Sequence, residues 1–572
     1  MNHPEPVLLG FERGGVPCEI TPVQRSTHMH VLGATNQGKS KFLENLIRQD
    51  IEHRHGVCLI DPHGSLYRDI VAWCADFGLH KRRKIHLIDP NESEWTVGFD
   101  PLRCDDPEFL STTVDAAVDA CAQVWGGEDS SKTPLLKKCL RAVFHALAAG
   151  GHSLGEALSL TSAKDLSGFR AKITGKLDDQ VFQAVWDDLN ALNPRDFADA
   201  FSSTNNRLIE FLASPSIRRM LRLKENALDV AKCMEDGDIV LVNLQPRKIS
   251  RDNARLIGTL LTNSLFTAAI RRDEKVAQKR PFYLYIDECY RFLSSDVESM
   301  LDETRKFGLH VILSHQHLGQ LRKYGEHIAN AVMTNARTKV VFGGLSEADG
   351  EPLAKEILRE TFDYSRVKEI LSKPTVVGYD IVTLKNWSTS VGRSSSTGES
   401  VSDSYTTSAG EGEGMSQSYD QDGLPLPGYT RSTSTSESAG STNGRGSSWS
   451  SSESFVESSG QSESLWPIFQ TLPSAVEGQE EILNRAILIL RKMPPGMFVL
   501  AQPGFPPRSV SAVRMEEPMV SARRVIIFAD AVRAASPFMV STVMADQTIA
   551  GRLAGPKKGV YAPDDFSVPE QG

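Results

Sequence analysis

The stretch that decides the fold is GATNQGKS, which runs from Gly33 to Ser40 and fills the phosphate-loop pattern G-x-x-x-x-G-K-[ST]. The two fixed glycines let the backbone turn so that its N–H groups point at phosphates. The lysine provides a positive charge for the β- and γ-phosphates, and the final hydroxyl can ligate Mg²⁺. The sequence therefore predicts that ATP or a related nucleotide, together with Mg²⁺, is bound by Gly33, Ala34, Thr35, Asn36, Gln37, Gly38, Lys39 and Ser40.

The segments on either side of this loop support the same interpretation. HMHVLGAT, residues 28–35, is typical of a short buried strand that leads into the loop. SKFLENLIRQDI, residues 40–51, carries apolar residues at helical spacing. A strand, a glycine loop and a helix in this order direct a helix N-terminus at an anion. This context disfavours a chance match to the pattern.

Length and composition predict a soluble protein of two to four structural units, about what 572 residues allow. The apolar content of 40% is enough for a large core, and no run approaches the length of a membrane span. The first residues, MNHPEP, do not resemble a signal peptide. We therefore expect a cytoplasmic location and no membrane span.

Cysteine and histidine spacing predicts no zinc site. The eight cysteines are scattered without a CxxC pair, and the histidine pairs lack further ligands at metal spacing. The expected role of the cysteines is that of small buried hydrophobic residues. The net charge of −9 argues against a protein that coats DNA, whereas a ring around DNA needs only a local basic lining.

Strands that alternate with helices predict an α/β fold with a mostly parallel sheet. A long stretch of helical periodicity interrupts this alternation, and a Ser-rich stretch follows it. The predicted boundaries are 1–104 for the first part of the nucleotide-binding domain with N-terminal strands, 105–233 for an inserted all-α domain, 234–386 for the second part of that domain, 387–465 for a Ser/Thr/Gly-rich disordered segment, 466–510 for a final helix-strand piece and 511–572 for a weakly structured tail. The S-x-S alternation in the Ser-rich segment leaves open a polar hairpin formed between neighbouring subunits.

The partner of the phosphate loop is YLYIDE, an apolar strand that ends in Asp287 and Glu288. Ligands collect at the carboxyl edge of a parallel sheet, where these carboxylates are expected. Asp287 is predicted to help hold Mg²⁺, and Glu288 to polarise the attacking water as a general base. LHVILSHQ is the next strand, and Gln316 at its end is a candidate for sensing the γ-phosphate or positioning water, or else a solvent-facing side chain.

Charge in a phosphoryl-transfer transition state usually requires an arginine as well. Arg218, Arg305 and Arg337 are candidates that the sequence alone does not separate. For DNA, the loop PRKISRDNAR, residues 246–255, carries four basic residues after a predicted core strand and is the first candidate for a pore loop. A solvated connection is the competing interpretation of this loop. HKRRK, residues 80–84, is interpreted as surface.

HVLGATNQGKS, LIDPHG, YLYIDE and TRKFGLHVILSHQ together resemble the HerA/FtsK superfamily of hexameric DNA-pumping ATPases, and most of all its TraG/TraD-type coupling proteins of conjugative type IV secretion. The resemblance covers about residues 28–380 and a short unit near 475–503. It implies a RecA-like motor domain with an inserted helical domain, assembled as a homo-hexamer with ATP between subunits. It also implies that Lys39 and Ser40 bind phosphate and Mg²⁺, that Asp287, Glu288 and Gln316 serve metal, water and γ-phosphate, and that an arginine of a neighbouring subunit completes the site.

The chain departs from that family pattern in two ways. The membrane-bound coupling proteins begin with transmembrane helices, and none is visible in this sequence. The loop has Asn36 where the family usually has glycine, and asparagine tolerates positive φ better than most residues.

The leading functional hypothesis is an ATP-driven motor that moves DNA without reading its sequence, with a relaxase or a secretion channel as partner. The alternatives are a HerA-like motor that works with a nuclease in end processing or phage defence, and a remodelling ATPase that switches a protein partner without moving DNA.

Overall fold

A computed structural model describes residues 5–126, 134–294, 297–357, 374–397, 404–419, 425–442, 449–471 and 479–553. The chain divides into two compact units, Met1–Phe362 with Leu483–Gly572 and Asp363–Ile482. Among the described residues, no helix has both the length and the apolar character that crossing a membrane requires.

The first unit is built on one large sheet. Its strands, with those of a small side sheet, are β1 (Val7–Phe11), β2 (Pro17–Ile20), β3 (Met29–Leu32), β4 (Gly56–Asp61), β5 (Ile85–Ile88), β6 (Trp95–Val97), β7 (Ile239–Asn243), β8 (Phe282–Ile286), β9 (Leu309–His315), β10 (Thr338–Phe342), β15 (Met497–Gln502), β16 (Phe505–Ala512) and β17 (Met539–Ser541). The described strands of the large sheet follow the order β2-β1-β16-β15-β10-β3-β9-β8-β4-β7-β5. From β10 to β5 all neighbours are parallel, and the other four strands add an antiparallel edge.

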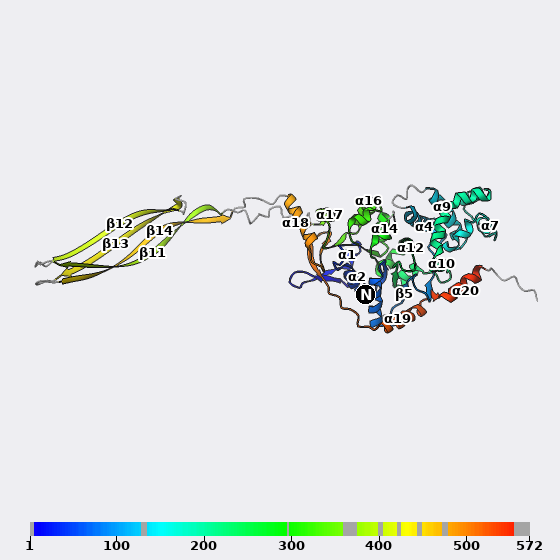
Figure 1. The fold of residues 1–572 in the computed structure, drawn as a ribbon, viewed down its shortest axis with the longest axis horizontal. Helices are drawn as coiled ribbons and strands as arrows, with labels where there is room; N and C mark the ends of the chain where they lie inside the picture. The colour runs from blue at the N-terminus through cyan, green and yellow to red at the C-terminus, as the bar shows by residue number, and fades with distance from the viewer. Residues whose placement is uncertain are drawn as a thin grey trace, which may run out of the picture. The chain divides into compact units, whose positions relative to one another are not determined.

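Helices cover both faces of this sheet (Figure 1). The helices of the described residues are α1 (Pro22–Arg25), α2 (Lys39–Glu52), α3 (Ser65–Asp76), α4 (Leu110–Gly126), α5 (Pro134–Ala149), α6 (Ala157–Leu160), α7 (Phe169–Thr174), α8 (Gln180–Asn190), α9 (Pro194–Ala213), α10 (Pro215–Arg222), α11 (Val230–Asp236), α12 (Arg251–Ile270), α13 (Glu274–Lys279), α14 (Val297–Thr304), α15 (Leu318–Arg322), α16 (Glu326–Asn335), α17 (Glu347–Ile357), α18 (Gln479–Lys492), α19 (Ala522–Ala535) and α20 (Thr542–Leu553). Helices α4 to α11 occupy the region predicted as the all-α insertion.

Burial explains why the central strands lack an alternating pattern. Every residue of β3, β4, β7, β8, β9 and β10 is buried, because helices lie on both faces. On one face Phe42 of α2, Leu66 of α3 and Phe528 of α19 belong to one apolar cluster. On the other face the cluster contains side chains of α12 and of the helical insertion, such as Leu256 and Val118.

The Ser-rich segment forms strands, so the prediction of disorder for 387–465 is wrong where the structure describes it. β11 (Pro374–Thr397), β12 (Ser404–Tyr419), β13 (Pro425–Thr442) and β14 (Trp449–Thr471) form an antiparallel sheet in the order β11-β14-β13-β12. Long antiparallel ladders pair the backbone N–H and C=O groups of these strands. The stretches 398–403, 420–424 and 443–448 lie outside the described residues.

The prediction of a weakly structured tail for 511–572 is also wrong up to Leu553. Helix α19 packs Phe528 and Val532 into the core beside α3, and β17 pairs with β6. Arg219 of α10 forms an ion pair with Asp546 of α20 at 2.7 Å. The apolar residues of this segment do not by themselves predict docking, because most of a helix's stability comes from the surface that receives it. Residues 554–572 lie outside the described part of the chain.

Candidate nucleotide-binding and hydrolysis site

The loop GATNQGKS lies between β3 and α2, as predicted. Two of its residues have positive φ, 63° at Asn36 and 105° at Gly38. Asparagine and glycine are the residues that adopt this conformation most readily, so Asn36 keeps the loop's shape without the glycine that is usual there. The loop ends at the N-terminus of α2, where unpaired N–H groups favour an anion.

Neighbouring elements hold the loop from behind. The Ala34 N–H donates to the Gly343 carbonyl at 3.2 Å, and the Gly496 N–H donates to the Gln37 carbonyl at 2.9 Å. A Cβ on Gly33 would lie 2.4 Å from the Cβ of Phe342, so only glycine fits there. The end of β10 and the turn before β15 therefore support the loop, which explains why a piece near the end of the chain belongs to this domain.

Lys39 is buried inside its own loop. Its Nζ donates to the carbonyl oxygens of Gly33 and Ala34, the second at 3.1 Å. Burial lowers the pKa of Lys39, although the carboxylates of Glu288 and Asp287 oppose that shift. The ammonium is thus held where phosphate oxygens of a nucleotide can take the place of the two carbonyls.

Asp287 and Glu288 follow β8 at the carboxyl edge, and both are at least nine-tenths buried. The Asp287 N–H donates to the Ile60 carbonyl at 3.1 Å, and Glu288 has a φ of 47°. Burial, together with the nearby carboxylates of Glu288 and Asp61, raises the pKa of Asp287 to about 7. Close carboxylates with a hydroxyl at Ser40 form an oxygen donor set that suits Mg²⁺, so the residues present fit the expected metal.

Gln316 joins the phosphate loop to the Glu288 carboxylate. The Thr35 hydroxyl donates to Gln316 Oε1 at 3.0 Å, and Gln316 Nε2 donates to Glu288 Oε1 at 2.7 Å. The side chain therefore faces the site and not open solvent. A γ-phosphate bound at the loop would lie beside an amide that also contacts Glu288.

The structure adds three residues that sequence reasoning did not assign. Gln320 accepts the Gln316 N–H at 2.8 Å and donates to Glu288 Oε2 at 3.4 Å. Asp61 accepts the N–H groups of His63 and Tyr67. His63 Nε2 lies 4.0 Å from Glu288 Oε1. The motif LIDPHG was a signal for Asp61 and His63, whereas Gln320 stands on a short helix with no motif of its own.

A buried histidine pair links two adjacent strands of the sheet, β3, which leads into the phosphate loop, and β9, which leads into Gln316. His30 Nε2 and His315 Nε2 are 2.6 Å apart, on the adjacent strands β3 and β9. Burial lowers the pKa of His315 to about 3, so the pair is neutral and one ring donates to the other. This contact holds the strand that carries Gln316 against the strand that enters the phosphate loop.

The arginine candidates do not join this site within one chain. Arg218 lies on α10 and donates to the Leu212 carbonyl at 2.8 Å. Arg305 precedes β9 and Arg337 precedes β10, so both lie at the amino edge of the sheet, opposite Lys39. Arg305 is exposed and has no side-chain partner among the described residues.

Arg305 borders a cavity of about 1880 Å³ along the amino edge, which we call the amino-edge cavity. It opens where β4, β5, β7, β8 and β9 begin. Its exposed cations that lack a side-chain partner among the described residues are Arg54, Arg82, Lys279, Arg305 and Lys306. The basic segment HKRRK contributes to this edge, so its interpretation as surface was incomplete.

The candidate pore loop, 246–255, follows β7 at the carboxyl edge. Arg247 and Arg251 are exposed and have no side-chain partner in the described part of the chain. The ammonium of Lys248 contacts the Ser93 hydroxyl, and Arg255 stacks 4.3 Å from the ring centre of Tyr324. Two of the four basic residues are therefore free to contact a phosphate backbone.

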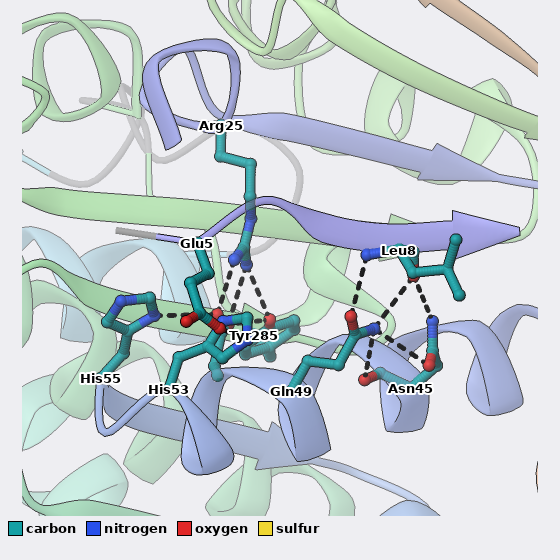
Figure 2. Close-up of polar contacts among 9 residues, drawn as sticks. Glu5, Leu8, Arg25, Asn45, Gln49, His53, His55 and Tyr285 are labelled. Carbon is teal, nitrogen blue, oxygen red and sulfur yellow. Dashed lines mark hydrogen bonds and ion pairs between the residues drawn. The ribbon is translucent and has the colours of Figure 1, made fainter. Parts of the chain in front are cut away.

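Helix α2 is fixed at its far end by a buried ion pair. The Arg25 guanidinium donates to Asp50 at 2.6 and 2.8 Å and to the Tyr285 hydroxyl at 3.0 Å, and Figure 2 shows Arg25 pointing from α1 toward Tyr285. Burial alone would raise the pKa of Asp50, but Arg25 overrides it and lowers the pKa to about 2. Gln49 and Asn45 both donate to the Leu8 carbonyl, at 2.9 and 2.8 Å (Figure 2). These contacts hold the helix, and with it the phosphate loop, in one orientation.

Comparison with known proteins agrees with this geometry. Residues 281–375 match a family model described as the TraM recognition site of TraD and TraG. The matched segment contains the candidate catalytic residues Glu288, Arg305 and Gln316. The resemblance to the TraG/TraD-type coupling proteins is confirmed.

Solved structures of one such coupling protein, TrwB, share the fold. An unbound form of TrwB lacking its N-terminus is 14% identical, with 91% of each chain covered and a TM-score of 0.52. A TrwB complex with a non-hydrolysable ATP analogue is 14% identical, covers 91% of this chain and 93% of that one, and has a TM-score of 0.50. A sulphate-bound form is 15% identical, with 90% and 91% covered and a TM-score of 0.50. The predicted α/β class with a mostly parallel, RecA-like sheet is confirmed. Among curated proteins no significant match was found.

Proposed function

We propose that this protein is an Mg²⁺-dependent ATPase of the coupling-protein type that uses hydrolysis to move DNA. The observation that carries the proposal is the side-chain bridge from Thr35 through Gln316 to Glu288, because it connects the nucleotide loop directly to a general base. Nucleotide binding alone does not require a carboxylate positioned as a general base, whereas hydrolysis does. ATP-analogue binding by TrwB supports ATP as the nucleotide.

Each residue then has a stated task. Lys39 and the loop N–H groups bind the phosphates, and Ser40 and Asp287 hold Mg²⁺, which neutralises charge on the phosphates. Glu288 accepts a proton from the attacking water. Gln316 orients that water and contacts the γ-phosphate. When the phosphate leaves, the Gln316 side-chain amide loses this contact.

The catalytic arginine must come from a second copy of the chain. Arg305 lies at the amino edge, away from Lys39 of its own chain, yet it is exposed and lacks a side-chain partner among the described residues. A ring in which the amino edge of one copy faces the carboxyl edge of the next supplies it in trans. A homo-hexamer has this arrangement, and Arg218 is the second candidate.

DNA is the proposed cargo. Arg247 lies on the loop after the core strand β7 and Arg251 at the start of α12, where movement of β7 during hydrolysis can displace them. Two arginines per subunit suffice for contacts to phosphates that do not depend on sequence. We propose a DNA-processing partner such as a relaxase, a secretion channel or a nuclease. We also propose that the protein acts in the cytoplasm.

The test is ATP hydrolysis by the purified full chain with and without DNA, next to Glu288→Gln. We expect DNA to stimulate hydrolysis in the wild type and Glu288→Gln to abolish it while ATP still binds. Arg247→Ala combined with Arg251→Ala should remove the stimulation and leave the basal rate, and Lys248→Ala is the matched control. Hydrolysis that ignores DNA in the wild type would contradict the motor and favour a remodelling ATPase.

A further inference from the structure

Three side chains that bind metals in other proteins meet at the end of the sheet far from the phosphate loop. His86 comes from β5, Cys233 from α11 and Asp238 from the residue before β7. Their exposed fractions are 2%, 1% and 5%, and their ligand atoms all lie within 4.8 Å of one another. No other group of this kind occurs among the described residues.

The orientation of His86 suits a metal ligand. Its Nδ1 lies 2.9 Å from the Ser536 hydroxyl, and its Nε2 lies 2.9 Å from Asp238 Oδ2. Without a metal, Nε2–H donates to Asp238 Oδ2 and Nδ1 accepts from the Ser536 hydroxyl; a cation that replaces the Nε2 proton would move that proton to Nδ1, which would then donate to Ser536. Metal-bound histidines use such an outer partner to fix the tautomer and the ring orientation. Phe538 packs 5.0 Å from the imidazole and limits its movement further.

Cys233 has no hydrogen-bond partner for its sulfur among the described residues, although it is almost fully buried. Burial raises the pKa of the Cys233 thiol, and the Asp238 carboxylate raises it further. The thiol is therefore neutral when no cation is near. A divalent cation at this point reverses that preference, since its charge stabilises the thiolate and the carboxylate together.

We propose that His86, Cys233 and Asp238 form a Zn²⁺ site. Sulfur, imidazole nitrogen and carboxylate oxygen are the three ligand types that Zn²⁺ accepts in a tetrahedral site, and their mixture favours it over Mg²⁺ or Ca²⁺. The thiolate and carboxylate balance the two positive charges of the ion. The thiol proton leaves to solvent when the metal binds.

The fourth position faces water. Asp238 also lines the amino-edge cavity, so a water molecule can reach the metal from that side. Ser536 and Phe538 lie just after α19, and the site therefore ties the C-terminal segment to β5 and α11. This inference does not depend on the proposed function, because none of these residues belongs to the nucleotide site.

The metal content of the purified full chain is the first measurement. We expect about one zinc ion per chain, retained on desalting and removed by a strong chelator. Replacement by Co²⁺ should give an absorption spectrum with a sulfur-to-cobalt charge-transfer band and strong visible bands of a four-coordinate ion. Cys233→Ser should abolish the charge-transfer band, and Cys121→Ser, which alters another buried cysteine, should keep it.

Ser536→Ala keeps all three ligands and tests the site if Cys233→Ser does not fold. Loss of the outer partner should weaken Zn²⁺ binding by roughly 10- to 100-fold, measured by competition with a chromophoric chelator. A chain that contains no zinc and gives no charge-transfer band with Co²⁺ would overturn the proposal. A band that survives Cys233→Ser would do the same.

Discussion

The two edges of the parallel sheet carry opposite chemistry. At the carboxyl edge, Lys39 is the cation of a buried group whose other members are the carboxylates of Asp61, Asp287 and Glu288. At the amino edge, exposed arginines and lysines line a cavity of about 1880 Å³, and five of them have no side-chain partner among the described residues. In the proposed phosphoryl transfer, which uses carboxylates, a metal ion and an arginine together, each edge would supply half of the site. The net charge of −9 therefore does not exclude the proposed polyanionic substrate, because cations gather at one edge.

The largest expected effect comes from replacing Arg305, the amino-edge arginine that is proposed to enter the nucleotide site of a neighbouring copy. Arg305→Ala should lower kcat by about 10³- to 10⁵-fold with little change in nucleotide affinity, because the arginine acts on charge in the transition state. Steady-state hydrolysis and equilibrium binding of a fluorescent ATP analogue measure the two effects. Lys306→Ala is the matched control, since it removes a neighbouring exposed cation. Equal effects of both variants would indicate a general charge effect and no catalytic arginine.

Breaking the ion pair behind the phosphate loop should come next. Asp50→Ala leaves the Arg25 guanidinium buried without its carboxylate, which should cost about 3–5 kcal/mol of unfolding free energy. Tyr285→Phe removes one hydrogen bond to the same pair and should cost only about 1 kcal/mol. Denaturant unfolding of the nucleotide-free protein gives both values. If the two substitutions cost the same, the ion pair does not anchor α2.

The pH dependence of stability probes the buried histidine at the amino edge. Burial lowers the pKa of His28 to about 4, and its ring accepts the Val311 N–H and donates to the Leu301 carbonyl. The unfolded chain therefore binds a proton that the folded chain does not between about pH 6.5 and 4. Stability should fall as pH falls through this window, by up to about 1.4 kcal/mol per pH unit from this residue.

His28→Asn is the comparison for that measurement, because asparagine tolerates the φ of 57° found at this position. The variant should be less stable at pH 7, and its stability should depend less on pH between 6.5 and 4. Parallel pH profiles for wild type and variant would show that His28 does not carry the effect.

The smaller of the two predicted effects on kcat concerns Gln320, which contacts both Gln316 and Glu288. Gln320→Ala should lower kcat by about 10²-fold through misplacement of the base, with KM little changed. Gln320→Glu keeps the acceptor for the Gln316 N–H but adds a carboxylate beside Glu288, so it should not restore the rate. An Ala variant with altered KM and normal kcat would instead mean that Gln320 serves nucleotide binding.

Local sequence motifs predicted those parts of the site whose residues are close together in the sequence. GATNQGKS and YLYIDE each combine an apolar strand with the functional groups that follow it, so their position at one edge of the sheet could be predicted. The contacts of Gln320, and the contact between His30 and His315, depend on which strands become neighbours in the sheet. Residue spacing along the sequence does not predict that order. The Ser-rich strands and helix α19 were missed because their stability comes from pairing and docking across the structure.

The group of His86, Cys233 and Asp238 is a second example of a feature that sequence spacing does not predict. The absence of a CxxC pair led to the expectation of no zinc site, yet the sheet brings one residue from each of three separate elements together. Sequence motifs for metal binding describe ligands that lie close together on one loop or helix. They do not predict ligands that the fold brings together from distant parts of the chain.

The proposed function requires that two copies of the chain build one ATP site. The direct measurement mixes two inactive variants, Lys39→Ala and Arg305→Ala, and follows ATP hydrolysis against their ratio at constant total protein. We expect the mixture to regain activity that neither variant has alone, with a maximum near equal amounts, because intact carboxyl edges then meet intact amino edges. Activity that stays at the level of the separate variants at every ratio, while the two demonstrably assemble together, would contradict it.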